Sequence, residues 1–208
     1  MSLITLVRHG ETTWNADHRV QGQLESPLSE RGLEQAAALA LRFKAETFDA
    51  LYSSDLSRAY DTAAKIAAAT GAELKVDERL RERHYGVFQS LTWNEIKTRF
   101  PAQYASYRSK FPGMTIPGGE PLKDFSSRVL AVLADIAGRH QHSVVVAHGG
   151  LVDIAYRQAN GIAAGQPRDY PLPNAGINRF HFDAGSRKWL VETFGDVEHL
   201  KAAGLDDE

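Results

Sequence analysis

Arg8 and His9 stand side by side where the apolar run at residues 4–7 ends and Gly10 follows. A guanidinium group next to an imidazole disfavours protonation of the ring, and it disfavours a bound metal cation for the same reason. An anion, by contrast, is attracted. The pair therefore predicts an anion-binding site beside a backbone that the glycine allows to turn tightly.

A second histidine has the same local setting. His148 and Gly149 follow the apolar run at 144–147, so His148 would face His9 if the two runs are neighbouring strands. One alternative is a pair of hydrogen-bonded histidines without a chemical role. Another is a metal site, but such sites usually add carboxylates or a third histidine and avoid nearby cations. We therefore expect an anion site and no metal.

Arg58 lies in the first turn of a helix predicted at 54–69, where its charge opposes the helix dipole. The free N–H groups at that helix start could also hold an anion. Arg58 either pairs with Asp55 or Asp61 at the surface, or it joins Arg8 in binding a phosphate dianion.

Glu82 lies in the charged stretch at 80–86, after a predicted strand. A carboxyl group held among cations and a phosphate could donate a proton to a reacting group. The same stretch could equally be a solvated charged loop.

Predicted strands and helices alternate along the chain. Apolar runs at 4–7, 48–52, 73–76 and 144–147 predict buried strands, and a late hairpin is predicted at 177–182 and 188–193. Helical patterns occupy 29–45, 54–69, 122–137 and 149–158. This order predicts the α/β class, as a three-layer α/β/α sandwich with a mostly parallel central sheet. Ligands bind beyond the carboxyl ends of such strands, which is where His9, Ser54 and His148 fall.

The length of 208 residues predicts one domain over 1–200, followed by an acidic tail at 201–208. A small helical and loop cap insertion is expected at about 87–121. There, a helical pattern at 91–107 is broken by Pro101, and a proline- and glycine-rich loop follows at 111–121.

Bulk composition narrows the class of protein. The net charge of −2 predicts no nucleic-acid partner and no anionic membrane partner. The absence of cysteine excludes disulfides, thiolate metal sites and a cysteine nucleophile. With neither a long apolar span nor a signal-peptide pattern, the sequence predicts a soluble cytoplasmic protein, as a monomer or homodimer.

Taken together, these residues resemble the histidine phosphatase superfamily, the phosphoglycerate-mutase-like group. The resemblance spans residues 3–200 and is carried by Arg8-His9-Gly10-Glu11-Thr12, Ser54 with Leu56-Ser57-Arg58-Ala59, Glu82, and His148-Gly149. It implies a phosphohistidine mechanism with no metal and no organic cofactor.

The resemblance also implies a role for each residue. His9 would be the nucleophile, and Arg8, Arg58 and His148 would bind the phosphoryl oxygens. Glu82 would protonate the leaving alkoxide and then activate water. Further phosphate or substrate contacts are implied, less specifically, for Asn15, Gln21, Gly22, Arg83, Tyr85 and Gly149. Substrate choice is expected to depend on Trp14, 21–24, His84, Phe88 and 100–121, with Trp14, Phe88 and Trp93 as alternative core residues.

The sequence favours hydrolysis over phosphoryl transfer. Arg83 and Tyr85 match mutase residues that contact a substrate carboxylate, but mutases then carry an insertion with clustered cations. Here the cations of that region are isolated: Lys97, Arg99, Arg108 and Lys110. Few charge-assisted bonds, each worth about 1.5–3 kcal/mol, would then retain a second anionic group. Segments 91–96, 117–120 and 172–178 are instead similar to the phosphatase branch.

We therefore predict a metal-independent phosphomonoester hydrolase acting on a small phosphorylated metabolite. One alternative is a cofactor-dependent phosphoglycerate mutase. An alternative of another class is a weakly catalytic phosphate-binding protein.

Overall fold

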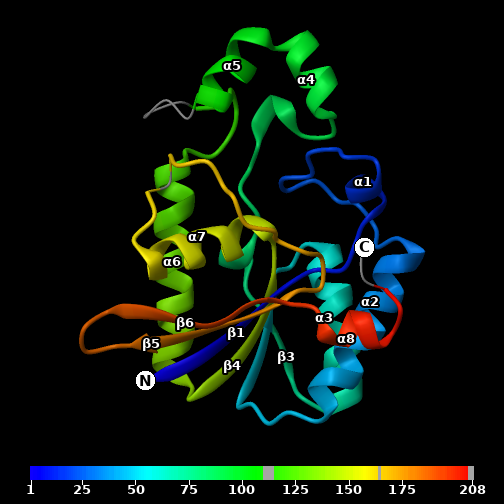
Figure 1. Ribbon diagram of the computed structural model, residues 1–208, viewed down its shortest axis with the longest axis vertical. Helices are drawn as coiled ribbons and strands as arrows, with labels where there is room; N and C mark the ends of the chain where they lie inside the picture. The colour runs from blue at the N-terminus through cyan, green and yellow to red at the C-terminus, as the bar shows by residue number, and fades with distance from the viewer. Residues whose placement is uncertain (110–114, 164, 206–208) are drawn as a thin grey trace.

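The computed structural model describes residues 1–109, 115–163 and 165–205. One six-stranded sheet runs through it, in the order β3-β2-β4-β1-β5-β6 (Figure 1). The strands are β1 Ser2–Arg8, β2 Ala50–Ser53, β3 Leu74–Val76, β4 His142–Ala147, β5 Ile177–Asp183 and β6 Lys188–Asp196. β1 to β4 are parallel, and β5 and β6 join antiparallel at one side. The prediction of a mostly parallel sheet is confirmed.

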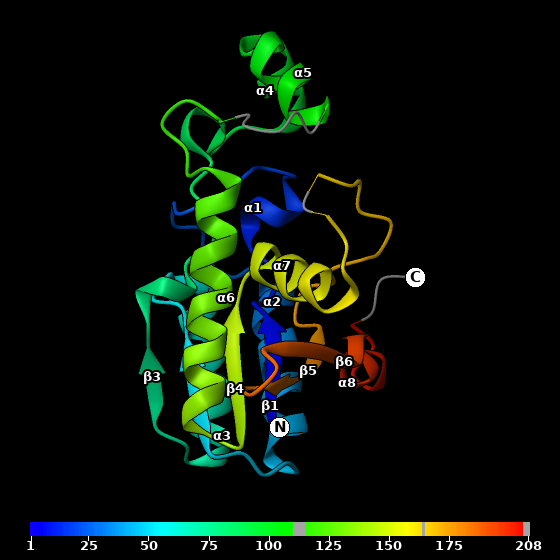
Figure 2. The same ribbon diagram turned by 90° about the vertical axis from the view of Figure 1, so that its left-hand side faces the viewer.

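Helices cover both faces of this sheet (Figure 2). The helices of the described chain are α1 Thr13–Ala16, α2 Glu30–Lys44, α3 Ser57–Thr70, α4 Trp93–Arg99, α5 Pro101–Ser109, α6 Leu122–Arg139, α7 Gly149–Asn160 and α8 Glu198–Ala202, with 3-10 turns η1 Glu78–Leu80 and η2 Gly86–Phe88. Local chemistry sets several of these ends. Ser29 caps α2 by accepting the Gly32 N–H, and Gly71 ends α3 in the left-handed conformation at φ 75°.

Two apolar cores separate the three layers, because successive strand residues point to opposite faces. On one face, Leu6 and Val145 pack with α6 and α7. On the other, Val7 and Val146 pack with α2, α3 and α8. All four of these side chains are fully buried. The three-layer α/β/α prediction is therefore confirmed.

The α4–α5 segment, defined here as residues 86–121 without 110–114, lies beyond the carboxyl ends of the parallel strands (Figure 1). It has a small apolar core of its own, made by Val20, Phe88, Leu91, Ile96 and Ile116. Its two ends meet, because Tyr85 pairs with Gly119. A Cβ at Gly86 would come 2.1 Å from the Pro117 carbonyl oxygen, so this close approach requires glycine. As the sequence predicted, Pro101 separates two helices here.

The structure differs from the sequence prediction at two short helices. α1 lies before the first helix that the sequence predicted, at 29–45, and begins where Thr12 and Asn15 form a capping box. α8 was not predicted and extends into the expected acidic tail. Leu200 is buried and Leu205 packs against the same core, which explains why this part of the chain is ordered. Lys110, 111–114 and 206–208 lie outside the described residues.

Candidate active site

His9 and His148 lie together at the carboxyl edge of the sheet. The β1–β4 register pairs Arg8 with Ala147, so each histidine directly follows a paired residue. Their ring centroids are 5.3 Å apart, with the ring planes at 61°. Both side chains are buried, with 3% of His9 and 0% of His148 exposed. The sequence expectation that these rings face each other therefore matches the geometry.

One hydrogen bond sets the tautomer of His9. The Nδ1 atom lies 2.7 Å from the Gly10 carbonyl oxygen. A carbonyl can only accept, so Nδ1 carries the proton and Nε2 keeps its lone pair. Burial, together with the charges of Arg58 and Arg8, holds the pKa of His9 well below its ordinary 6.5. At neutral pH the ring is therefore uncharged.

The backbone of His9 is hydrogen-bonded by residues that the sequence did not place at the site. Its carbonyl accepts from Asn174 Nδ2 at 3.0 Å and from the Ala175 N–H at 3.1 Å. The Gly10 N–H donates to Thr62 Oγ1 at 3.1 Å. Asn174 reaches His9 because β5 pairs with β1, and no local pattern near either residue signals that pairing.

Arg58 is 1% exposed and points inward. It donates to the carbonyls of Gly22, at 2.7 Å, and Leu24, at 3.0 Å. Asp55, one of its expected surface partners, instead accepts from Arg81. Burial lowers the pKa of Arg58 to about 10, so the group stays charged at neutral pH. Among the described residues, the hydrogen bonds of Arg58 go to neutral carbonyls, so this buried cation can still hydrogen-bond an anion.

The sequence left the N–H groups at the start of α3 as possible anion-binding groups. In the structure, the first of these groups already has a partner within the protein. The Ser57 N–H donates to the carboxylate of Glu25 at 3.0 Å. Glu25 thereby caps a helix whose N-cap residue, Leu56, has no side-chain acceptor.

Arg8 donates through Nη1 to the carbonyl of Leu172. Its Nε has no partner among the described residues, and neither does Nε of Arg58. Burial lowers the pKa of Arg8 to about 10, and the charge of Arg168 adds to this lowering. Arg168 is therefore near the site, although nothing in the sequence pattern indicated it.

His148 is the N-cap residue of α7, and neither of its ring nitrogens has a partner within the described part of the chain. Burial and the charge of Arg58 hold the pKa of His148 well below 6.5. Buried polar groups normally have a hydrogen-bond partner, so the ring nitrogens of His148 are available to bond a ligand. Beside it, a Cβ at Gly149 would lie 3.4 Å from Nε of Arg8.

Glu82 is not part of a solvated loop. Its carboxylate accepts from the Arg83 N–H at 2.7 Å and from the Gly150 N–H, in the first turn of α7, at 2.9 Å. A Cβ at Gly150 would come 2.1 Å from Glu82 Oε1, so the second glycine after His148 makes room for this carboxylate. Glu82 also interacts electrostatically with Arg8 and Arg58.

The geometry thus gathers a neutral histidine, a second histidine, two buried arginines and a carboxylate. A family model described as histidine phosphatase superfamily (branch 1) matches residues 4–196. The chain belongs to the histidine phosphatase superfamily. The resemblance inferred from the sequence is confirmed.

The relatives that this chain resembles include proteins named as phosphatases and proteins named as phosphoglycerate mutases. A metal-independent phosphoserine phosphatase of Arabidopsis thaliana is 41% identical over 97% of this chain and 84% of its own length. A probable phosphoglycerate mutase, GpmB of Salmonella choleraesuis, is 35% identical over 100% of this chain and 99% of its own. A solved Entamoeba histolytica phosphoserine phosphatase, in complex with 3-phosphoglyceric acid, has a TM-score of 0.84 at 27% identity, over 96% of this chain and 100% of that one.

Asn15, Gln21 and Gly22 were predicted to contact phosphate or substrate less specifically than His9, Arg8, Arg58, His148 and Glu82. Asn15 uses its Oδ1 to accept from the Thr12 N–H at 3.1 Å, which leaves its NH₂ group to donate elsewhere. Gln21 is buried, and no described residue bonds to its Oε1. Gly22 acts through its backbone, since its carbonyl orients Arg58.

Arg83 and Tyr85 form a second polar region next to Glu82. Arg83 is 5% exposed; Nε donates to the Glu120 carbonyl at 2.8 Å, and Nη2 has no partner among the residues described. The Arg83 guanidinium lies 5.6 Å from the Tyr85 ring centroid. Burial raises the pKa of Tyr85 well above 10, with a further contribution from Tyr107, so α5 reaches this region.

The aromatic residues expected near the substrate separate into two groups. Phe88 is fully buried in the core of the α4–α5 segment, where it packs against Phe100 and Tyr107. Trp93 is 38% exposed and stacks on Tyr107, with ring centroids 5.4 Å apart. Trp14 is partly buried. His84 accepts the Gly86 N–H on Nδ1 at 3.0 Å.

In the ranges that the structure describes, no three His, Cys, Asp or Glu side chains gather as a metal site would require. Nor does any helix in these ranges have the length and apolarity to cross a membrane.

Proposed function

We propose that this chain is a metal-independent phosphomonoester phosphatase in which His9 carries the phosphoryl group. The observation that supports this most is the uncharged His9 ring, with Nε2 unprotonated, among Arg8, Arg58 and His148. Such a ring can attack phosphorus, while the cations and His148 stabilise the charge on the phosphoryl oxygens.

The first step is displacement at phosphorus. The lone pair of His9 Nε2 forms the N–P bond as the P–O bond to the leaving group breaks. Glu82, in its protonated form, gives its proton to the leaving oxygen, so an alcohol departs instead of an alkoxide. The Gly10 carbonyl keeps the other ring nitrogen protonated and the ring aimed.

The second step is hydrolysis. Glu82, now a carboxylate, takes a proton from water, and the oxygen of that water attacks the phosphohistidine. The N–P bond breaks, its electron pair returns to Nε2, and inorganic phosphate leaves. His9 is again neutral, as burial and the two arginines favour.

The placement of the cations supports hydrolysis over transfer. Lys97, Arg99 and Arg108 are exposed on α4 and α5 instead of clustering at the site. Lys110 lies outside the described residues. With few cations to hold a bisphosphate while it reorients, water reaches the phosphohistidine first.

For the substrate we propose a small phosphomonoester with a carboxylate, of the kind named for the phosphoserine phosphatase relatives. Arg83 has one unpartnered buried nitrogen, and Arg168 adds a charge near Arg8. Both could attract a carboxylate.

We further propose a single domain over 1–200 in which 87–121 serves as a cap, and a reducing, cytoplasmic location that suits a chain with no cysteine.

The test is turnover of phosphoserine and 4-nitrophenyl phosphate with excess chelator. Wild-type protein should release phosphate and form an acid-labile phosphoenzyme. His9→Ala should lose both, with kcat falling by at least about 10³-fold, because the nucleophile of the covalent route is gone. Phosphate release without a phosphoenzyme would contradict the mechanism. No turnover of any ester would favour a phosphate-binding protein.

A second candidate function is phosphoglycerate mutase, which the name of the Salmonella relative favours. The products from 3-phosphoglycerate, with and without 2,3-bisphosphoglycerate, separate the two. A phosphatase yields glycerate and phosphate, whereas a mutase yields 2-phosphoglycerate only when the bisphosphate is present.

A further inference from the structure

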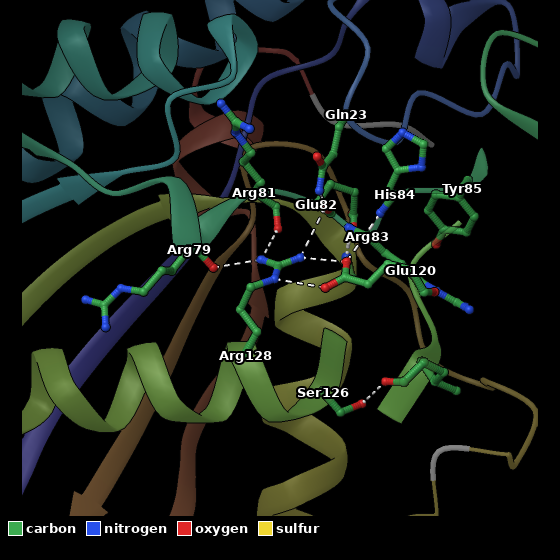
Figure 3. A network of polar contacts seen from close by, with 12 residues as sticks. Gln23, Arg79, Arg81, Glu82, Arg83, His84, Tyr85, Glu120, Ser126 and Arg128 are labelled. Atoms are coloured by element: carbon green, nitrogen blue, oxygen red, sulfur yellow. Dashed lines mark hydrogen bonds and ion pairs between the residues drawn. The ribbon is translucent and has the colours of Figure 1, made fainter. Parts of the chain in front are cut away.

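The backbone segment that carries Glu82 has little regular structure of its own. It follows η1 and is hydrogen-bonded to α6, through Arg128, and to α7, through Gly150 (Figure 3 shows the contacts of Arg128). Side chains hold its outer side, where Arg79 pairs with Asp77 and Asp135 and Arg81 pairs with Asp55. Its inner side presents backbone carbonyls to α6. The position of Glu82 therefore depends on what α6 offers to those carbonyls.

Arg128 on α6 bonds to three of these carbonyls. Its Nη1 donates to the carbonyls of Arg79, at 2.7 Å, and Arg81, at 2.8 Å. Its Nη2 lies 3.5 Å from the carbonyl of Glu82, which also accepts from Gln23 Nε2 at 3.0 Å. Three backbone carbonyls of this segment are thus directed at one planar guanidinium group (Figure 3).

The remaining donors of Arg128 go to Glu120. Nε donates to Oε1 at 3.0 Å, and Nη2 donates to Oε2 at 2.8 Å. All five N–H groups of the guanidinium are therefore directed at acceptors. A lysine, with three donors on one nitrogen, cannot reproduce this fork.

Glu120 joins the same segment from the other side. Its backbone N–H donates to the His84 carbonyl at 2.8 Å, and its carbonyl accepts from Arg83 Nε at 2.8 Å. Glu120 lies where the α4–α5 segment returns to α6. The Arg128–Glu120 pair therefore connects the base of the α4–α5 segment to the loop of Glu82.

The pair is 23% and 18% exposed at its side chains, so solvent screens its mutual attraction. What it supplies is geometry. Within the described residues, every hydrogen bond of Arg128 goes to the Glu82 segment or to Glu120, and none goes to His9, Arg8, Arg58 or His148.

We propose that Arg128 and Glu120 are positioning residues for proton transfer by Glu82, a role that rests on the proposed phosphatase function. By fixing the carbonyls on both sides of Glu82, the pair aims its carboxyl group at the leaving oxygen. Loosening the pair would weaken protonation of the leaving group while leaving attack by His9 intact.

The test compares esters whose leaving groups need different amounts of protonation. Arg128→Lys and Glu120→Gln should lower kcat/KM, which reports the leaving-group step and not the shared hydrolysis step, by about 10-fold or more for phosphoserine, an alkyl ester, and by under about 3-fold for 4-nitrophenyl phosphate, since acid catalysis is worth roughly 10²–10⁴-fold where it is needed. The matched control is Arg42→Lys, which alters a similar Arg–Glu46 pair on α2, away from the Glu82 segment, and should change neither rate.

A double variant gives the deciding measurement. If Arg128 acts through Glu82, the combination of Glu82→Gln with Arg128→Lys should be no slower on phosphoserine than Glu82→Gln alone. Additive losses, or equal losses on both esters, would overturn the proposal. So would Glu120→Gln with unchanged kinetics, which does not depend on whether Arg128→Lys folds.

Failure of the proposed function would look different. If Glu82→Gln itself lowers kcat/KM for both esters equally, Glu82 is not the acid and the positioning role is wrong with it. If Glu82→Gln discriminates between the esters and the Arg128 and Glu120 variants do not, the phosphatase mechanism stands and only the positioning role is refuted.

Discussion

His9 and His148 have the same residue type, burial and depressed pKa, yet their hydrogen bonding assigns them different chemistry. Nδ1 of His9 donates to the Gly10 carbonyl, which fixes a nucleophilic Nε2. His148 has no such bond in the described structure, so its ring can take the tautomer that donates to a phosphoryl oxygen. One backbone carbonyl therefore distinguishes His9, the proposed nucleophile, from His148, the proposed phosphate-binding residue.

Arg168 offers a test of substrate recognition at the residue scale. It is exposed, and its charge contributes to lowering the pKa of Arg8, so it lies where it can attract the carboxylate of a substrate. Arg168→Ala should raise KM for phosphoserine by roughly five-fold, the equivalent of about 1 kcal/mol for an exposed ion pair, and leave KM for 4-nitrophenyl phosphate unchanged. Steady-state kinetics at low and high salt measure this.

Salt supplies the internal check on that prediction. Screening should shrink the effect of Arg168→Ala on phosphoserine as ionic strength rises. The matched charge deletion is Lys188→Ala, on the exposed β5–β6 hairpin, which should change neither KM. An equal rise in KM for both esters would assign Arg168 to the phosphate instead of the carboxylate.

At the scale of elements, α7 holds Glu82 through a glycine. In Gly150→Ala, the new Cβ would meet Glu82 Oε1 at 2.1 Å and the Phe125 ring at 3.0 Å. Glu82 must then leave the Gly150 N–H. We expect kcat for phosphoserine to fall by about 10²-fold or more, the lower range for a lost general acid, with a smaller loss for 4-nitrophenyl phosphate.

The matched control for that substitution is Gly138→Ala, in the last turn of α6. A Cβ there has no atom within 4 Å. Alanine should leave activity unchanged and stabilise the protein by about 0.5–1 kcal/mol, because glycine is the poorer helix former. If Gly150→Ala behaves like Gly138→Ala in both assays, contact between Glu82 and α7 is not needed for turnover.

The helices and strands also show which parts of the site the sequence could predict and which it could not. The strands that end at His9 and His148 were predictable, because an apolar run followed by histidine and glycine is a local pattern. At the start of α3, which the sequence left as a possible anion site, nothing local signals that Glu25, 32 positions earlier, accepts from the Ser57 N–H. The contacts of Asn174 with His9 and of Arg128 with the Glu82 segment depend likewise on pairings between distant elements.

At the scale of the whole molecule, burial of neutral histidines makes stability depend on pH. His9, His148 and His199 all have a pKa below the ordinary 6.5, with burial as the main cause. In the unfolded chain each takes up a proton near pH 6.5, whereas in the folded protein each resists doing so. Below that pH the unfolded state binds more protons, so the free energy of unfolding must fall as pH falls.

The expected slope is up to about 1.4 kcal/mol per pH unit for each histidine between pH 6.5 and 5, measured by urea unfolding at closely spaced pH values. Carboxylates such as Asp55, whose pKa lies below 3.8, lose their contribution only at lower pH, so this window isolates the histidines. His148→Gln removes one titrating group and should reduce the slope, whatever it does to activity. A free energy of unfolding that stays constant from pH 7 to 5 would mean that these rings are hydrated and protonated in the folded protein, and the uncharged nucleophile at His9 would then be wrong as well.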